Sequence, residues 1–235
     1  MKLKIRSLAG VSAVVLAGAL SASADTVTYN FGSVSSGGTP AGTPPWVQAT
    51  FTDAGMPADT VQLTLSGGNL VGSEFVSGWY FNLNSSLNAA ALTFTATGST
   101  GTFTIPTVQT GTDGFKAGPD GKFDVLLGFS TSGDSSSRFM NGDSLTFDIS
   151  GITGLTANDF DSLSTCAGGS GLYASAVHIQ SIDGGDSAWV NPTSTLVQNE
   201  SVDRQVPDHS TTVALLGASL LVIEGMRRKM RRQTA

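Results

Sequence analysis

Three aspartates in a glycine-rich stretch are the residues of this chain with the best spacing to hold a metal ion. Asp113, Asp120 and Asp124 are interspersed with glycines where a loop leads into a strand. Carboxylate oxygens suit Ca²⁺, but an EF-hand loop needs oxygen ligands at alternate positions, a central glycine and a closing glutamate, and this spacing lacks that order. We therefore expect acidic turn residues facing water, no cofactor, and at most weak Ca²⁺ binding.

Paired carboxylates are the sharpest enzymatic option, because two of them at the right separation can hydrolyse a glycosidic bond. Glu74 and Asp124 are the best pair, since each adjoins a phenylalanine, Phe75 or Phe123. Serine hydrolase motifs are incomplete, and His178 is the only histidine outside the C-terminal tail. Any acidic chain offers such carboxylate pairs. The sequence therefore predicts a protein with no catalytic residues, and a glycoside hydrolase is kept as an alternative.

Aromatic side chains offer a third kind of chemistry, because their faces pack against sugar rings. Trp46, Trp79 and Trp189 are the candidates for glycan contact. The strands of a β-sandwich also need such side chains for their core, and this is the favoured interpretation. A carbohydrate-binding module or adhesin with a defined glycan site is the first alternative function.

Charge restricts the partners of the chain. Three of its 12 basic residues lie in the first six positions and five in the tail, while 16 of its 18 acidic residues lie between them. The segment between the two ends therefore carries four basic and 16 acidic residues, a net charge of −12. Such a domain does not bind nucleic acid, whose phosphates require Lys and Arg. Cys166 is the only cysteine, so no intramolecular disulfide forms.

The first 24 residues have the composition of a secretory signal peptide. Basic residues near the start precede an apolar run over residues 8–20, and the small residues Ala22 and Ala24 stand before Asp25. The apolar run is shorter than the roughly 20 residues that a membrane-spanning helix needs. We expect cleavage between Ala24 and Asp25, which places the domain outside the cytoplasm.

The middle of the chain predicts an all-β fold, an antiparallel β-sandwich or jelly-roll-like domain over residues 25–190. Apolar and polar residues alternate in short runs that Gly, Asn, Asp and Ser separate. Helical periodicity is almost absent, and one capping-box-like start occurs at Thr156. The expected strands are Thr26–Phe31, Trp46–Thr52, Thr60–Ser66, Gly78–Leu83, Ala91–Thr97, Gly101–Pro106, Lys122–Ser130, Asp143–Ile149, Ala174–Ser181 and Ser187–Val190.

The C-terminal part divides into a polar linker over residues 191–205 and a tail over residues 206–235. The tail begins with Val206, Pro207 and Asp208, continues with an apolar run, and closes with a basic cluster that remains on the cytoplasmic side of a membrane. The apolar run predicts a short transmembrane helix. The basic cluster consists of Arg227, Arg228, Lys229, Arg231 and Arg232.

This tail, with the signal peptide and the β-rich middle, resembles the PEP-CTERM class of exported bacterial proteins, in its VPDSG-CTERM branch. The resemblance implies processing by an exosortase, an integral-membrane protease, and only transient anchoring in the inner membrane of a Gram-negative bacterium. It also implies association with exopolysaccharide and biofilm. We therefore expect a non-enzymatic secreted protein, sorted to the cell surface or extracellular matrix.

Overall fold

The computed structural model describes residues 24–166 and 172–193, and these residues form a single antiparallel sheet. The ten strands are β1 (Thr26–Gly37), β2 (Val47–Thr52), β3 (Val61–Gly67), β4 (Phe75–Phe81), β5 (Thr93–Thr100), β6 (Thr107–Lys116), β7 (Lys122–Gly128), β8 (Ser144–Ser150), β9 (Ser175–Ile182) and β10 (Asp186–Pro192). Their order across the sheet is β5-β8-β3-β2-β1-β10-β9-β4-β7-β6. The predicted all-β fold is confirmed.

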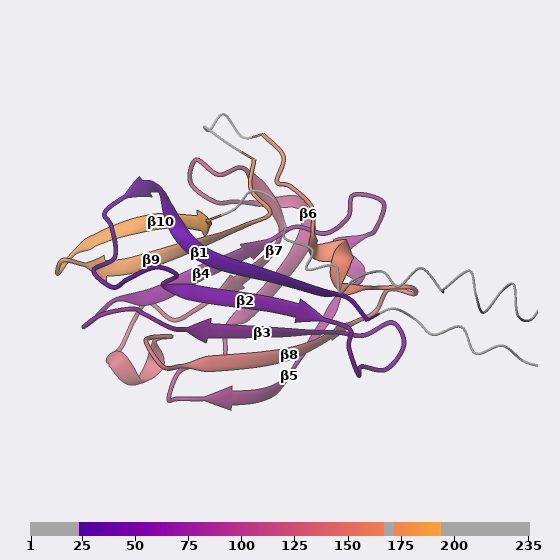
Figure 1. The fold of residues 1–235 in the computed structure, drawn as a ribbon, viewed down its shortest axis with the longest axis horizontal. Coiled ribbons are helices and arrows are strands. Elements are labelled where there is room, and N and C mark those ends of the chain that lie inside the picture. The colour runs from indigo at the N-terminus through magenta and orange to yellow at the C-terminus, as the bar shows by residue number, and fades with distance from the viewer. Residues whose placement is uncertain (1–23, 167–171, 194–235) are drawn as a thin grey trace, which may run out of the picture.

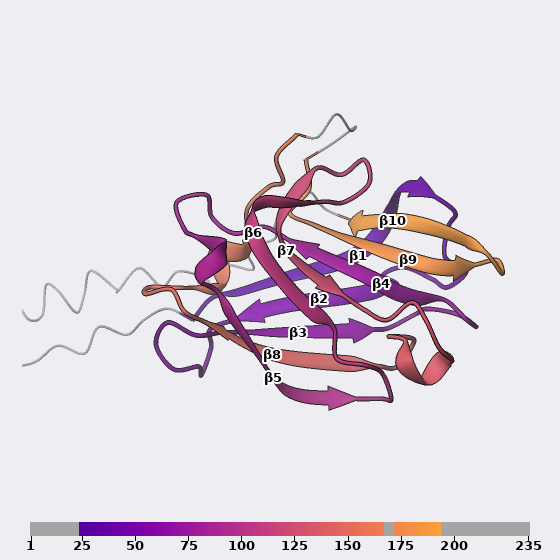
Figure 2. The ribbon, with the colours of Figure 1, turned by 180° about the vertical axis from the view of Figure 1, so that it is seen from behind.

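The sheet curls so that its two halves face each other and nearly close. Strands β1, β2, β3, β8 and β5 lie in one layer (Figure 1), and β4, β7 and β6 cross in front of that layer when the molecule is seen from behind (Figure 2). The edge strands β5 and β6 lie at the two ends of the strand order. Opposed layers of this kind bury the inward side chains of both halves.

Alternation of apolar and polar residues determines which side chains enter the core. In β3, Val61, Leu63 and Leu65 are fully buried while the residues between them are half-buried. Strands β2 and β8 follow the same pattern, as expected where one sheet face meets a core and the other meets water. Phe51 packs between the two layers, stacked on Phe160 at 4.3 Å between ring centroids.

One expected strand is wrong, and one observed strand was missed. Residues Gly101–Pro106 connect β5 to β6 and are not a strand, whereas Thr107–Lys116 form the edge strand β6. The side chain of Ile105 is exposed, so the apparent alternation of Phe103 and Ile105 does not mark a buried face. At the other end of the domain, β10 runs to Pro192, two residues beyond the expected boundary at residue 190.

Regular helix is limited to short turns within the described residues. The predicted helix start at Thr156 is confirmed as a capping box on the 3₁₀ turn Ala157–Phe160, with Asp159 accepting hydrogen bonds from the backbone and side chain of Thr156. No helix in the described part of the chain is long and apolar enough to cross a bilayer. The predicted transmembrane helix lies outside the described residues.

Candidate functional site

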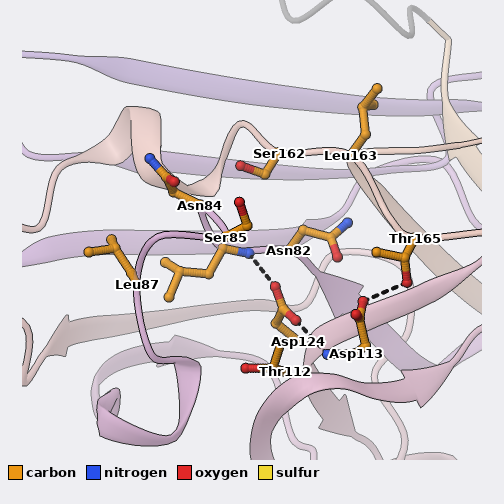
Figure 3. A pocket seen from close by; sticks show the side chains of 11 residues that line it. Asn82, Asn84, Ser85, Leu87, Thr112, Asp113, Asp124, Ser162, Leu163 and Thr165 are labelled. Atoms are coloured by element: carbon orange, nitrogen blue, oxygen red, sulfur yellow. Dashed lines mark hydrogen bonds between the residues drawn. The ribbon is translucent and has the colours of Figure 1, made fainter.

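A polar pocket of about 440 Å³ opens between three parts of the fold (Figure 3). The chain leaving β4 lines one side, the β6–β7 hairpin lines the second, and residues 162–165 line the third. The polar residues that matter most for its chemistry are Asn82, Ser85, Thr112, Asp113, Asp124 and Thr165.

A large bulge in β6 carries Asp113 to this pocket. Thr110 pairs with Val125 and Phe115 pairs with Phe123, so residues 111–114 lie opposite Asp124 alone. Asp113 has a φ of 50°, in the left-handed region that Asp and Asn tolerate better than most residues. Bulges redirect side chains out of the regular ladder, and this one places a carboxylate at the pocket wall.

Asp124 replaces the missing ladder partner of that bulge. Its Oδ1 accepts a hydrogen bond from the backbone N–H of Asp113 at 2.7 Å, and its Oδ2 accepts one from the N–H of Leu83 at 2.9 Å. Only 9% of the residue is exposed. The carboxylate thus holds β6 and the chain leaving β4 together, and Thr165 donates its hydroxyl to Asp113 Oδ1 at 2.6 Å from the third side.

The loop after β4 is fixed from both ends. Asn82 is buried and donates its amide to the backbone carbonyls of Tyr173 and Ala174. Asn84 donates its backbone N–H to the Asp159 carbonyl at 2.7 Å and its amide to Asp159 Oδ1 at 3.3 Å. The pocket wall is therefore held in place before any ligand arrives, a condition that favours binding.

The three aspartates considered for a metal ion do not come together in the structure, and Asp120 and Asp124 are buried and do not face water as expected. Asp113 and Asp124 meet at the pocket, but Asp120 is fully buried elsewhere, where its Oδ2 accepts a hydrogen bond from the Ser35 hydroxyl at 3.0 Å. Burial raises the pKa of Asp120, and the nearby Ser35 and Asn191 side chains partly oppose that rise. No group of three metal-binding side chains occurs among the residues that the structure describes.

Glu74 and Asp124 do not form the nominated catalytic pair. They flank opposite ends of β4, and eight residues of extended chain separate their positions by roughly 26 Å. Glycosidases need carboxyl groups about 5–9.5 Å apart. Glu74 is 2% exposed, and its two oxygens accept the backbone N–H groups of Ala41 and Val71, each at 2.8 Å. Its carboxylate is a structural clamp.

Two of the three tryptophans proposed for glycan contact belong to the core. Trp46 is 3% exposed and Trp79 is fully buried, so the favoured interpretation as core residues is confirmed for both, and neither can contact a glycan. Trp189 is half-buried on the outer face, where its ring stacks on His178 at 4.5 Å between centroids and lies 5.4 Å from the ring of Tyr80. Of the three tryptophans only Trp189 remains partly accessible.

A serine–histidine contact was missed by the sequence reasoning, which found no partner for His178. The Ser77 hydroxyl lies 2.8 Å from His178 Nδ1 and 3.2 Å from the His178 carbonyl oxygen, linking the neighbouring strands β4 and β9. Burial lowers the pKa of His178, so its ring is neutral over a wider pH range. The two residues are 101 positions apart, and no local pattern reveals such a contact.

The predicted sites near the two ends of the chain fall largely outside the described residues. Asp25, the expected first residue of the mature protein, donates its backbone N–H to Asp53 Oδ1 at 2.6 Å, next to the start of β1. The folded domain thus begins beside the predicted cleavage site. Ala22, the sorting residues 206–208 and the basic cluster lie outside the described ranges.

Comparison with known families identifies the tail. The model of the VPDSG-CTERM motif matches residues 205–230. No curated protein and no solved structure matches the chain. The chain therefore carries a C-terminal sorting motif of the PEP-CTERM/exosortase type, which confirms the predicted resemblance. The motif suggests an exported protein routed to the cell surface and implies processing by an exosortase-type membrane enzyme.

Proposed function

We propose that this protein, once exported and processed, associates with exopolysaccharide at the cell surface or in the extracellular matrix of a Gram-negative bacterium, and that it catalyses no reaction. The observation that carries the proposal is the sorting motif over residues 205–230. In this proposal the motif directs the protein to the cell surface, and the folded domain associates with exopolysaccharide there.

The described domain suits a hydrated matrix. The edge strand β5 exposes a run of threonine and serine hydroxyls along nearly its whole length. Such groups hydrogen-bond to water or to sugar hydroxyls without introducing charge. The net charge of −12 between the two ends of the chain adds solubility, and weak Ca²⁺ bridging to acidic polysaccharide is a further proposed contribution.

The contacts of Glu74 and Asp124 support a non-enzymatic role. Each carboxylate holds two backbone N–H groups in place, and the distance between them is too long for glycosidic cleavage. A glycoside hydrolase remains the alternative to exclude by assay. The test is turnover of the host polysaccharide by the exported protein, measured as release of reducing ends, and we expect none.

Processing of the tail is the first part of the test. We propose that an exosortase cleaves near Val206–Asp208 while the apolar run anchors the chain transiently in the inner membrane. Mass spectrometry of the exported protein should find Asp25 at the start and no arginine cluster at the end. The Pro207→Ala variant should accumulate as uncut precursor in the inner membrane. Recovery of intact Arg232 from the extracellular fraction contradicts this route.

Association with polysaccharide is the second part of the test. Exported protein should sediment with the purified host polysaccharide, and a chelator or monovalent salt should release the part that Ca²⁺ bridges, because salt screens exposed charges. Bovine serum albumin is a suitable acidic control. If the exported protein stays in the supernatant at every Ca²⁺ concentration, the proposal of exopolysaccharide association is wrong.

A glycan-binding module with a defined site is the second candidate function, and the polar pocket beside Asp113 favours it. A rigid pocket of about 440 Å³ lies within the range of roughly 300–1,000 Å³ that small-molecule sites occupy. Association with polysaccharide through a diffuse acidic surface would not require such a pocket, whereas a glycan-binding module would.

A further inference from the structure

We propose that the pocket formed by the β6 bulge, the loop after β4 and residues 162–165 binds a single neutral or amino sugar residue of a polysaccharide. This inference deepens the proposed function and rests on it for the source of the sugar. The binding site itself stands on the geometry of the pocket.

The pocket has the right size for one sugar ring. A pyranose has about twelve non-hydrogen atoms and fills roughly 200 Å³ at close-packed density. The volume of about 440 Å³ therefore admits one ring with its hydroxyls and some bridging water. The same volume does not enclose a long oligosaccharide, so the rest of a polymer would leave through the open mouth.

Several polar atoms at the pocket wall have no partner among the described residues. The hydroxyls of Ser85, Thr112 and Ser162, the Oδ2 atom of Asp113 and the amide oxygen of Asn82 form no hydrogen bond there. A sugar hydroxyl can donate to the carboxylate or the amide oxygen, and it can accept from a serine or threonine hydroxyl. The wall thus offers both donors and acceptors to vicinal hydroxyls.

Leucine side chains supply the apolar part of the wall. The pocket lining includes Leu83, which is buried, Leu87, which is half-buried, and Leu163, which is 52% exposed. A pyranose has apolar C–H faces as well as a rim of hydroxyls, so a wall of mixed character matches it better than it matches a simple ion. The exposed Leu163 would lose contact with water on binding, which contributes favourably.

Charge decides which sugars fit. Two carboxylates line the pocket, and no lysine or arginine is among its described lining residues. A uronic acid, a sulfated sugar or a phosphate would bring a like charge close to Asp113 and Asp124 without a compensating cation, which is unfavourable in a partly buried site. A neutral sugar avoids that cost, and an ammonium group of an amino sugar gains an attraction.

A divalent cation fits the pocket less well than a sugar does. Ca²⁺ takes six to eight oxygen ligands, with carboxylates as the strong ones. Both oxygens of Asp124 already accept backbone N–H groups, whose positive ends would repel a cation. Of the two carboxylates that line the pocket, only that of Asp113 retains an oxygen that accepts no hydrogen bond from the described residues. Hydrogen bonding to a hydroxyl-rich ligand uses the same atoms without this conflict.

The test uses the exported protein and five soluble probes: glucose, galactose, N-acetylglucosamine, glucosamine and glucuronic acid. Saturation-transfer difference NMR should detect millimolar binding of at least one neutral sugar or of glucosamine, the affinity expected for a ligand of about twelve atoms. Glucuronic acid should bind at least tenfold more weakly. No detectable binding of any probe at about 50 mM, or equal binding of glucuronic acid, overturns the inference.

Two variants locate the site. Thr112 is exposed on β6 and lines the pocket, so Thr112→Trp should fill the pocket and abolish sugar binding. Gln109→Trp places the same side chain at an exposed position of the same strand outside the pocket, and it should bind sugar as the wild type does. Asp113→Asn keeps a residue that tolerates the left-handed backbone and should weaken glucosamine binding about tenfold, more than binding of neutral sugars.

The same variants separate this inference from the proposed function. If Thr112→Trp binds probe sugars as tightly as Gln109→Trp, with both proteins folded by circular dichroism, the pocket is not the site. If Thr112→Trp still sediments with the host polysaccharide but no longer binds the probes, exopolysaccharide association stands and uses another surface. If the wild type binds the probes but does not sediment with polysaccharide, the pocket stands and the proposed function fails.

Discussion

Replacing Glu74 by glutamine should destabilise the fold without changing any chemistry. The side chain is 2% exposed and holds Ala41, in the segment between β1 and β2, to Val71, in the connection before β4. Glutamine keeps one acceptor oxygen but turns an NH₂ group toward the other backbone N–H. One hydrogen bond is lost, and a buried donor then faces another donor.

The size of the effect follows from these two contacts. A hydrogen bond to a charged group contributes about 1.5–3 kcal/mol, so Glu74→Gln should reduce the free energy of unfolding by about that amount. In a domain of this size, this corresponds to a melting temperature about 3–12 °C lower. Glu74→Ala loses both bonds and should cost about 3–6 kcal/mol. Urea unfolding followed by tryptophan fluorescence measures both, because Trp79 is fully buried.

A surface carboxylate provides the matched control for this series. Asp186 is exposed at the start of β10, so Asp186→Asn should change the free energy of unfolding by less than about 0.5 kcal/mol. If Glu74→Gln unfolds at the same urea concentration as Asp186→Asn, the clamp contributes nothing and our account of Glu74 is wrong. Loss of a polysaccharide-cleaving activity in Glu74→Gln, with unchanged stability, would instead identify a catalytic carboxylate.

Three further changes test other parts of the fold. Burial lowers the pKa of His178, so below pH ~6.5 the unfolded chain binds more protons than the folded protein does, and the free energy of unfolding should fall there. In urea denaturation at pH 5.5 and 7.5, His178→Asn should therefore lose less stability on acidification than the wild type. Burial raises the pKa of Asp120, so its contribution to stability decreases as pH rises through the folded pKa. Asp120→Asn should therefore raise the melting temperature at pH 7 and give no gain below pH ~3.8. A lower melting temperature of the variant at pH 7 contradicts this. Gly118 has a φ of 45°, and a Cβ there would lie 2.5 Å from Trp189 Nε1. Gly118→Ala should therefore reduce the free energy of unfolding by about 1–3 kcal/mol. An unchanged melting temperature would show that Trp189 moves freely.

Strands with one buried face could be predicted from the sequence, whereas the edge strand could not. Residues Val61 to Leu65 alternate because one face of β3 meets the core. Strand β6 is half-exposed on alternate residues and carries two glycines in its bulge, so its apolar pattern is weak. Apolar and polar residues also alternate over residues 101–106, but this segment is not a strand. Phe103 packs against the core there, while Ile105 remains in water.

The pocket depends on strand pairings that a single sequence does not show. Asp113 and Asp124 are close in sequence, and the glycines around them indicate a turn, so the sequence named both as weak candidates for Ca²⁺ but did not predict a pocket. Asn82 and Thr165 reach the same pocket from distant parts of the chain. Trp79 and Tyr80 are neighbours on opposite faces of β4, and only the paired sheet shows that Trp79 points inward. Local residue patterns do not carry this information.

The position of β10 also determines when the sheet can be completed during folding. Among the described strands it is the last in the sequence, yet it lies between β1 and β9 and pairs with both. Until it arrives, the chain has two separate groups of strands, one of five and one of four, with no ladder between them. An exported chain crosses the membrane from its first residue to its last, so the domain stays incomplete until residue 192 has emerged. The strand that joins the two groups, residues 186–192, therefore precedes the sorting motif, which begins at residue 205.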